Sequence, residues 1–183
     1  MSSSNASSSS PSPASAAGAI RPVEWRDRGS IERILRATQA FSEEETRVAL
    51  ELVDAACAKP DEDYIVRVLE LPGAGVAGYT CHGRTPFTDG TYDLYWIAVD
   101  PAYYGTGAAR RLMAEAERDV FERRGGRLII VETASKPSYA RTRRFYESMG
   151  YAQAARIRDF YRAGDDKIIY EKRKVQTEAA PAE

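Results

Sequence analysis

The stretch WIAVDPAYYGTGAARRLM, Trp96–Met113, passes from an apolar segment through a proline and two tyrosines into a glycine-rich turn. The turn leads directly into apolar positions that repeat every three and four residues from Ala109 to Val120, which is typical of a helix with one buried face. The first amides of a helix have no partner within the helix, and glycine lets the backbone close around an anion. The stretch therefore predicts a strand, a phosphate-binding turn and a helix, in that order.

Two arginines in the first turn of this helix favour a bound anion. Arg110 and Arg111 carry positive charge where the helix dipole disfavours it by about 0.3 to 1 kcal/mol for each exposed side chain. A phosphate at the turn would reverse that penalty, whereas a plain strand-to-helix turn is the alternative that the glycines leave open. Two other phosphate-binding motifs fit less well, because the stretch lacks the third glycine of a dinucleotide-binding turn and the Gly-Lys-Ser/Thr of a P-loop.

Composition limits the class of protein. The chain has 183 residues, 43% of them hydrophobic and 29% charged, which predicts one globular domain. Its net charge of -1 argues against a nucleic-acid partner. Cys57 and Cys81 belong to no ligand motif, so no metal site is expected. The sequence has no apolar run of membrane-spanning length and no signal-peptide pattern, which predicts a cytoplasmic protein with no membrane partner.

The chain divides into one domain and two tails. Residues 1–19, rich in serine, proline and alanine, and residues 176–183 are predicted to be disordered around a folded domain that spans 20–175. Ser42 and Glu45 form the pattern of a capping box at the start of a helix. Strands are expected at 20–25, 63–71, 75–83, 91–99, 127–133, 151–161 and 167–173, and helices at 29–38, 42–57, 107–124 and 135–150. This order predicts an α/β fold with a mixed sheet.

Two motifs carry a resemblance to a known family. VDPAYYGTGAARRLM resembles the acetyl-CoA signature of the GNAT superfamily of N-acetyltransferases, in which Val-x-Pro leads to Gln/Arg-x-x-Gly-x-Gly/Ala. RRFYESMGY, residues 143–151, is similar to the helix of that family that ends in Phe/Leu-Tyr-Glu-x-x-Gly-Phe/Tyr. Tyr104 departs from the first motif, which has Gln or Arg there. The matching positions of the first motif are Val99, Pro101, Gly107 and Ala109.

The resemblance covers residues 20–173 and implies a mixed, mostly antiparallel sheet of about seven strands with helices on both faces. It also implies that strands 92–99 and 128–133 separate, with the pantetheine arm of acetyl-CoA between them. That arm would pair with the backbone of Ile97, Ala98 and Val99. The pyrophosphate would bind the turn, which consists of Tyr104, Gly105, Thr106, Gly107, Ala108, Ala109 and Arg110.

Further contacts to the coenzyme are expected from three arginines and a tyrosine. Arg111, Arg143 and Arg144 are candidates for the phosphate oxygens, although an arginine on a helix is more often part of a solvated surface. Tyr139 lies on the same helix face as Tyr146, at a position where many members of the resembled family have Asn. We expect Tyr139 to pack on the coenzyme.

Acetyl transfer to an amine requires a base, because an alkyl amine with a pKa near 10 is mostly protonated at neutral pH. Glu132 and Asp93 lie on the two strands that face each other and are candidates for this base, and a carboxylate in the cleft would have a raised pKa. A structural role at a strand end is the alternative for both. His82 has a suitable pKa but is expected in an exposed turn just after a strand, where a histidine is usually incidental.

Two further groups complete the expected chemistry. Tyr146 stands at the general-acid position of the resembled family, where its hydroxyl would return a proton to the leaving thiolate. A core aromatic with a satisfied hydroxyl is the alternative for Tyr146. A backbone amide near Ile97 or Ala98 is expected to stabilise the oxyanion.

These features predict an N-acetyltransferase that moves the acetyl group of acetyl-CoA to the primary amine of a small molecule or an amino acid by direct attack in a ternary complex. The alternatives are a protein N-terminal or lysine acetyltransferase and a non-catalytic acyl-CoA-binding module, and a homodimer is left open. The lack of an acidic run argues against a polycationic acceptor. Aromatic residues expected around the acceptor are Phe87, Tyr92, Tyr95, Trp96, Phe160 and Tyr161.

Overall fold

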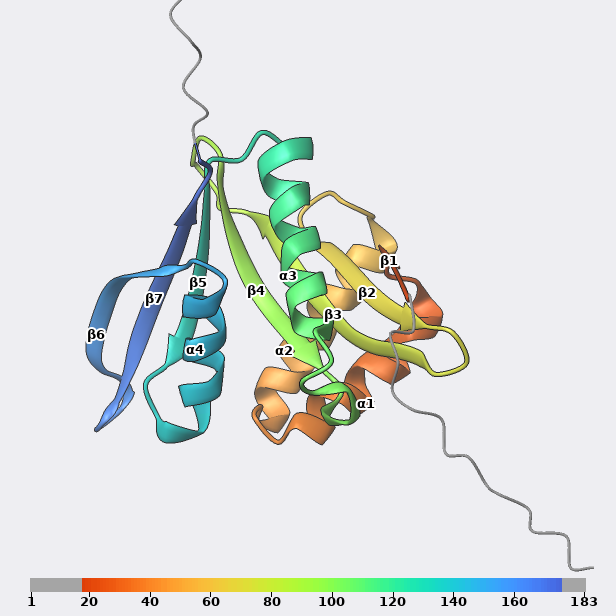
Figure 1. Cartoon of the computed structure of the whole chain (residues 1–183), viewed down its shortest axis with the longest axis horizontal. Helices are drawn as coiled ribbons and strands as arrows, with labels where there is room; N and C mark the ends of the chain where they lie inside the picture. Colours follow the sequence, from red (N-terminus) through yellow and green to blue (C-terminus); the bar gives the residue numbers. More distant parts are fainter. Residues whose placement is uncertain (1–17, 176–183) are drawn as a thin grey trace, which may run out of the picture.

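A seven-stranded sheet in the order β1-β2-β3-β4-β5-β7-β6 forms the centre of the computed structural model, which describes residues 18–175 (Figure 1). Neighbouring strands are antiparallel except for β4 and β5, which are parallel. The predicted mixed, mostly antiparallel sheet is therefore confirmed. The strands are β1 (Ala19–Pro22), β2 (Ile65–Leu71), β3 (Gly75–Arg84), β4 (Thr91–Val99), β5 (Leu128–Ala134), β6 (Ala152–Arg162) and β7 (Asp165–Arg173).

Helices cover both faces of the sheet. The helices α1 (Arg28–Thr38) and α2 (Glu43–Ala58) lie on one face, and α3 (Ala108–Arg118) and α4 (Ala140–Ser148) lie on the other (Figure 1). The predicted capping box starts α2, because the Glu45 amide donates to Ser42 Oγ at 3.1 Å and the Ser42 amide donates to Glu45 Oε2 at 2.7 Å. No helix within residues 18–175 is long and apolar enough to cross a membrane. Of the tails predicted at 1–19 and 176–183, residues 1–17 and 176–183 lie outside the described residues, whereas Ala19 already belongs to β1.

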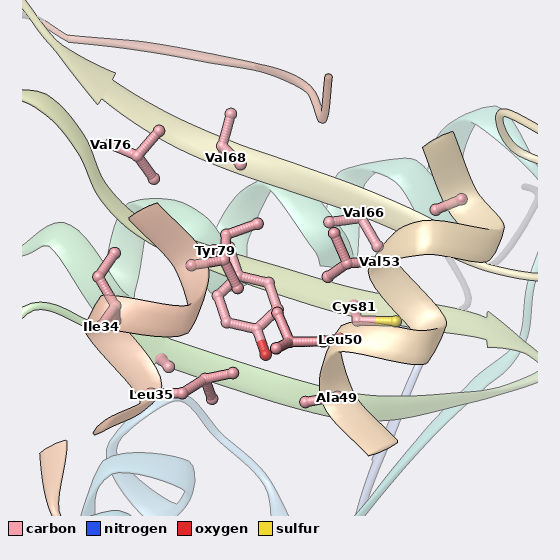
Figure 2. Close-up of a cluster of buried hydrophobic side chains, with 13 residues drawn as sticks. Ile34, Leu35, Ala49, Leu50, Val53, Val66, Val68, Val76, Tyr79 and Cys81 are labelled. Atoms are coloured by element: carbon pink, nitrogen blue, oxygen red, sulfur yellow. The ribbon is translucent and has the colours of Figure 1, made fainter. Parts of the chain in front are cut away.

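The core between the first two helices and the sheet fixes the β2–β4 half of the molecule. Figure 2 shows Ile34 and Leu35 of α1 and Leu50 and Val53 of α2 around Tyr79 of β3. None of these five side chains is more than 6% exposed. Each large apolar side chain buried in this way contributes about 1.5 to 3 kcal/mol relative to an exposed one.

The β4 and β5 strands pair over only part of their length. The parallel ladder runs from Thr91 opposite Leu128 to Leu94 opposite Val131 and then ends. The register of β4 against β3 shifts at Tyr95, which is an extra residue on β4 and forms a bulge. A bulge bends its strand and increases the local twist. The far halves of β4 and β5 therefore separate (Figure 1), which confirms the separation that the family resemblance implied.

Several predicted boundaries differ from the structure; for example, the helix predicted at 135–150 is α-helical only over Ala140–Ser148. The first strand ends at Pro22 and not at residue 25, because Trp25 begins a 3-10 turn and is 59% exposed. The helix predicted over 107–124 ends as α-helix at Arg118 and continues as a π-helical segment, Asp119–Arg123. At the start of this segment the Asp119 carboxylate turns inward and is 3% exposed.

The expected place of His82 in an exposed turn is wrong. His82 lies within β3 and is 1% exposed, because the strand continues to Arg84. Its Nε2 lies 3.0 Å from Asp119 Oδ2, and Asp119 Oδ2 also accepts a hydrogen bond from Arg124 Nε at 2.6 Å. His82 is therefore part of a buried polar network below α3 and does not line the functional pocket described below.

The buried His82 makes the stability of the protein sensitive to acid. Burial lowers the pKa of His82 below 6.5, although the hydrogen bond with Asp119 acts in the opposite direction. The unfolded chain therefore binds a proton at a higher pH than the folded chain, and the free energy of unfolding falls as the pH drops below about 6.5. We expect urea unfolding to give a lower free energy at about pH 5.5 than at about pH 7.5.

The control for this prediction is His82→Gln, because His82 is the single histidine of the sequence. The variant lacks the group that titrates in this pH range, so its free energy of unfolding should change little between the two pH values. An equal loss of stability in both proteins would assign the effect to other groups.

Candidate active site

A pocket of about 1220 Å³ opens where β4 and β5 separate. It is lined by the connection between α1 and α2, the far half of β4, the turn before α3, the end of β5, the start of α4 and the β6–β7 hairpin. Asp93, one of the two carboxylates predicted as the base, does not line it. The predicted residues that do line it are Ile97, Ala98, Val99, Tyr104, Gly105, Thr106, Gly107, Ala108, Ala109, Arg110, Glu132, Tyr139 and Tyr146.

The glycine turn has the geometry of an anion site. Gly105 and Gly107 have φ angles of +80° and +88°, which favour glycine, and a Cβ at either position would meet nothing within 4 Å. The first helical hydrogen bond of α3 runs from the Arg111 amide to the Gly107 carbonyl at 3.0 Å. Within the described chain, the amides of Gly105 and of residues 107–110 have no hydrogen-bond acceptor. These free donors at a helix N-terminus suit the diphosphate of a coenzyme.

The far half of β4 presents a free backbone edge to the gap. The Asp100 amide donates to the Ala77 carbonyl of β3 at 2.8 Å. Backbone groups alternate along an antiparallel strand, so the Ala98 amide also points toward β3, while the amides of Ile97 and Val99 point toward the gap. An extended ligand with amide groups can pair with this edge as an added strand. Of the two amides expected as oxyanion donors, the Ile97 amide has the required direction.

Tyr146 combines a buried ring with a free hydroxyl. The residue is 5% exposed, and its ring centroid lies 6.0 Å from that of Tyr151 and 5.9 Å from that of Tyr170. The Tyr151 hydroxyl donates to Met113 Sδ and the Tyr170 hydroxyl donates to Glu147 Oε1. The Tyr146 hydroxyl has no such partner among residues 18–175 and belongs to a residue that lines the pocket. Burial raises the pKa of Tyr146 above 10, so the hydroxyl keeps its proton at neutral pH.

The two predicted carboxylates lie in different surroundings. Glu132 lies at the pocket, with its Oε2 2.5 Å from Lys167 Nζ of β7. Asp93 lies on the part of β4 that still pairs with β5, and its Oδ2 accepts a hydrogen bond from Thr85 Oγ1 at 2.7 Å. Burial raises the pKa of Asp93, and the nearby charge of Glu132 adds to this effect. Glu132 is therefore the carboxylate with direct access to the pocket.

Most of the arginines expected at the phosphates have other partners. Arg111 donates to the Gly18 carbonyl, and Arg143 donates to the Ala134 carbonyl at 2.7 Å and to the Lys136 carbonyl at 3.1 Å. Arg111, Arg143 and Arg144 do not line the pocket. These interactions agree with the structural alternative for Arg111 and Arg143.

Three arginines do line the pocket, and two of them, Arg141 and Arg162, were not predicted. Arg110 reaches from the start of α3 to the end of α4, where it donates to Ser148 Oγ at 3.0 Å. Arg141 lies in the first turn of α4, with its guanidinium carbon 4.3 Å from the centroid of the Tyr104 ring. The signal that singled out Arg110, a cation in the first turn of a helix, is also present at Arg141.

The aromatic lining is smaller than predicted. Phe87 lies fully exposed on the β3–β4 connection, Tyr92 is 7% exposed in the core under α3, and Phe160 packs under Lys167 with 50% exposure, so none of the three lines the pocket. Tyr139 lines it, and its hydroxyl donates to the Ala40 carbonyl at 3.0 Å. The predicted aromatic residues that remain in the lining are Tyr95, Trp96 and Tyr161.

The fold and the pocket together define a class of protein. A strand edge that can pair with an amide-containing arm runs toward free amides that can bind a diphosphate, and a protonated tyrosine hydroxyl lies beside both. This combination defines an acyltransferase that takes its acyl group from a coenzyme A thioester. The sequence profile of the Acetyltransferase (GNAT) family matches residues 28–151, and the chain belongs to this family. Its cosubstrate is acetyl-CoA, which the free amides and the open β4 edge fit.

Known proteins agree with this assignment. A GNAT-family acetyltransferase structure from Desulfovibrio desulfuricans shares 44% identity and a TM-score of 0.81, over 85% of this chain and 98% of that one. An acetyltransferase structure from Salmonella typhimurium, solved with its cofactor acetyl-CoA, has a TM-score of 0.67 at 22% identity, over 90% of this chain and 98% of that one.

A curated relative matches a smaller part of the chain. The N-alpha-acetyltransferase RimI of Mycobacterium tuberculosis is 36% identical over 88 residues, which are 48% of this chain and 51% of that protein. The match therefore spans about half the length of this relative. Within residues 18–175, no group of three or more His, Cys, Asp or Glu side chains is arranged to hold a metal ion.

The first site prediction concerns the glycine turn. Gly107→Asp places a side chain and a negative charge among the free amides, so we expect the affinity for coenzyme A, measured by calorimetry, to fall by about 100-fold or more, or roughly 2.7 kcal/mol. Gly73→Asp is the matched control, because Gly73 also has a positive φ, +73°, and open space around it but lies in the β2–β3 turn. Equal losses of affinity in both variants would contradict the placement of the diphosphate.

Proposed function

We propose that this protein transfers the acetyl group of acetyl-CoA to the primary amine of a small molecule or an amino acid, by direct attack in a ternary complex. The single observation that carries the proposal is the free Tyr146 hydroxyl in the same pocket as the coenzyme-binding amides. Tyr146 is 5% exposed as a residue, yet its oxygen is not a fully buried atom, so the hydroxyl opens on the pocket and can donate its proton to a bound substrate.

The residues of the pocket divide the chemistry among them. Acetyl-CoA supplies the acetyl group as a thioester, which the amine nitrogen attacks while the carbon–sulfur bond breaks. The Ile97 amide donates a hydrogen bond to the carbonyl oxygen as negative charge develops there. The Tyr146 hydroxyl donates its proton to the departing sulfur, because the thiolate needs a proton and Tyr146 holds one throughout the neutral range. The nitrogen loses its extra proton as the amide forms, and a proton returns to the Tyr146 oxygen through water.

Glu132 is the base in this proposal. The carboxylate lines the pocket and takes the proton from the acceptor ammonium, directly or through one water molecule. Lys167 holds the Glu132 carboxylate from the β7 side. Asp93 is the second candidate for the base, because burial and the charge of Glu132 raise its pKa. Asp93 does not line the pocket, which makes it the weaker candidate.

Three carboxylates line the end of the pocket where we place the acceptor. Burial raises the pKa of Tyr161, and the charges of Glu132, Asp165 and Glu45 raise it further. These three carboxylates come from β5, the β6–β7 hairpin and the start of α2, and all three residues line the pocket. Glu132 is paired with Lys167 and Asp165 with Arg162, whereas Glu45 has no cationic partner among residues 18–175. Glu45 can therefore attract an ammonium group, which supports an amine as the acceptor.

A second candidate acceptor is the N-terminal amine of a protein. The similarity to the N-alpha-acetyltransferase RimI, 36% identity over 88 residues, favours it. Release of free thiol from acetyl-CoA, measured with amino acids, small amines and peptides in parallel, separates the two acceptors. Activity with peptides alone would move the assignment to a protein N-terminus, and activity with no amine would contradict an N-acetyltransferase.

The role of Tyr146 predicts a loss of turnover. Tyr146→Phe removes the proton donor and keeps the ring, so we expect kcat to fall by about 100-fold or more with little change in the KM for acetyl-CoA. The matched control is Tyr151→Phe, which removes a neighbouring hydroxyl that donates to Met113 Sδ. If both variants keep the turnover of the wild type, Tyr146 is a core aromatic and not the acid.

The role of Glu132 predicts a change in the pH profile. Glu132→Gln removes the base, so we expect kcat/KM to fall by about 100-fold at neutral pH and to recover as the pH approaches the pKa of the acceptor amine. Asp93→Asn is the comparison, since Asp93 does not line the pocket. A larger loss in Asp93→Asn than in Glu132→Gln would make Asp93 the base.

A further inference from the structure

An arginine–tyrosine stack joins two sides of the pocket beside the glycine turn. Tyr104 directly precedes Gly105 and is 44% exposed. The guanidinium carbon of Arg141 lies 4.3 Å from the centroid of the Tyr104 ring, and both residues line the pocket. The stack therefore connects the turn before α3 to the first turn of α4.

The charge of Arg141 is not neutralised by the protein. Arg143 of the same helix donates to two backbone carbonyls, and Arg162 at the acceptor end of the pocket lies 3.8 Å from a carboxylate oxygen of Asp165. In the described part of the chain, Arg141 has only the Tyr104 ring as a partner. A cation–π contact orients a guanidinium group but leaves its N–H donors free for another ligand.

The position of Arg141 is unfavourable without an anion. The N-terminal end of a helix carries partial positive charge, so an arginine in the first turn of α4 is disfavoured by the helix dipole. The same is true of Arg110 at the start of α3, and both arginines face the pocket that contains the free amides of the turn. A diphosphate bound there would offset both repulsions, because its oxygens carry negative charge and accept several hydrogen bonds.

We propose that Arg141, oriented by the ring of Tyr104, binds the diphosphate of acetyl-CoA together with the amides of the glycine turn. Tyr104 is then a positioning residue that acts through Arg141. Tyr104 stands where the first motif has Gln or Arg. In this chain the polar group beside the turn is therefore the guanidinium of Arg141, which belongs to α4. The inference rests on the acetyl-CoA part of the proposed function and is independent of the acceptor and of Tyr146.

Binding of three ligands tests the inference. Coenzyme A and 3′-dephospho-coenzyme A both contain the diphosphate, whereas pantetheine contains no phosphate. We expect Arg141→Gln to weaken both nucleotide ligands by about tenfold in calorimetry and to leave the affinity for pantetheine unchanged. The slope of log Kd against log salt concentration for coenzyme A should also decrease, because one phosphate contact is lost.

Tyr104 variants test the positioning role. Tyr104→Ala should weaken coenzyme A in the wild-type background and have no further effect in the Arg141→Gln background, since it acts through that side chain. Tyr104→Phe keeps the stack and should bind as the wild type does. Arg144→Gln is the control, because Arg144 is an exposed arginine of the same helix outside the pocket.

Several results would overturn the inference. The first is an unchanged affinity of Arg141→Gln for coenzyme A, and the second is an equal loss of affinity for coenzyme A and for pantetheine. The third is a loss of affinity for coenzyme A that is absent with 3′-dephospho-coenzyme A, and the fourth is additive effects of the Tyr104 and Arg141 variants on affinity. Both side chains lie at the surface of the pocket, and thermal unfolding of each variant checks that the fold is retained. A wild-type protein that does not bind coenzyme A at all would contradict the proposed function itself.

Discussion

The short ladder between β4 and β5 is the constraint on which the site depends. The ladder ends after Leu94, where the bulge at Tyr95 turns the rest of β4 away from its neighbour. Backbone groups left unpaired in a buried place cost about 1 to 3 kcal/mol each, so this edge has to face water or a ligand. The gap is therefore a pocket and is not filled by core side chains. The strand β4 stays paired with β3 and the strand β5 stays paired with β7, so the sheet holds together on both sides of the gap.

The helix α3 packs against both sides of this gap. Leu112 packs with Val99 and the β2–β4 half of the sheet, whereas its neighbour Met113 packs with Val131 and Tyr146 on the β5–β7 half. Adjacent residues of one helix thus contact both sides, which fixes the distance between them. The same helix begins at the glycine turn, so the packing that keeps the gap open also positions the free amides at its end. The ring of Tyr146 packs in the cluster that contains Met113, Tyr151 and Tyr170, and this packing fixes the position of the hydroxyl at the pocket.

Much of the fold and part of the site could be predicted from local patterns. The capping box at Ser42 and Glu45, the apolar strand before the glycine turn and the positive φ of Gly105 and Gly107 depend on near neighbours in the chain, and the sequence contains those neighbours. The burial of His82 could not be predicted in this way, because its partner Asp119 lies on a π-helical segment that no local pattern indicates. Strand alternation also leaves open which aromatic side chains face the core and which face the gap.

The arginines illustrate most clearly where sequence reasoning ends. Four arginines lie near the start of a helix, namely Arg110, Arg111, Arg141 and Arg143. Their charge and their position in the helix alone predict anion binding equally for all four. The structure separates them by what each long side chain can reach. Arg111 and Arg143 reach backbone carbonyls and are used to hold Gly18 and the end of β5, whereas Arg110 and Arg141 extend over the pocket. A carbonyl partner within reach depends on how distant segments pack, so a binding arginine is distinguished from a structural one only when the fold is known.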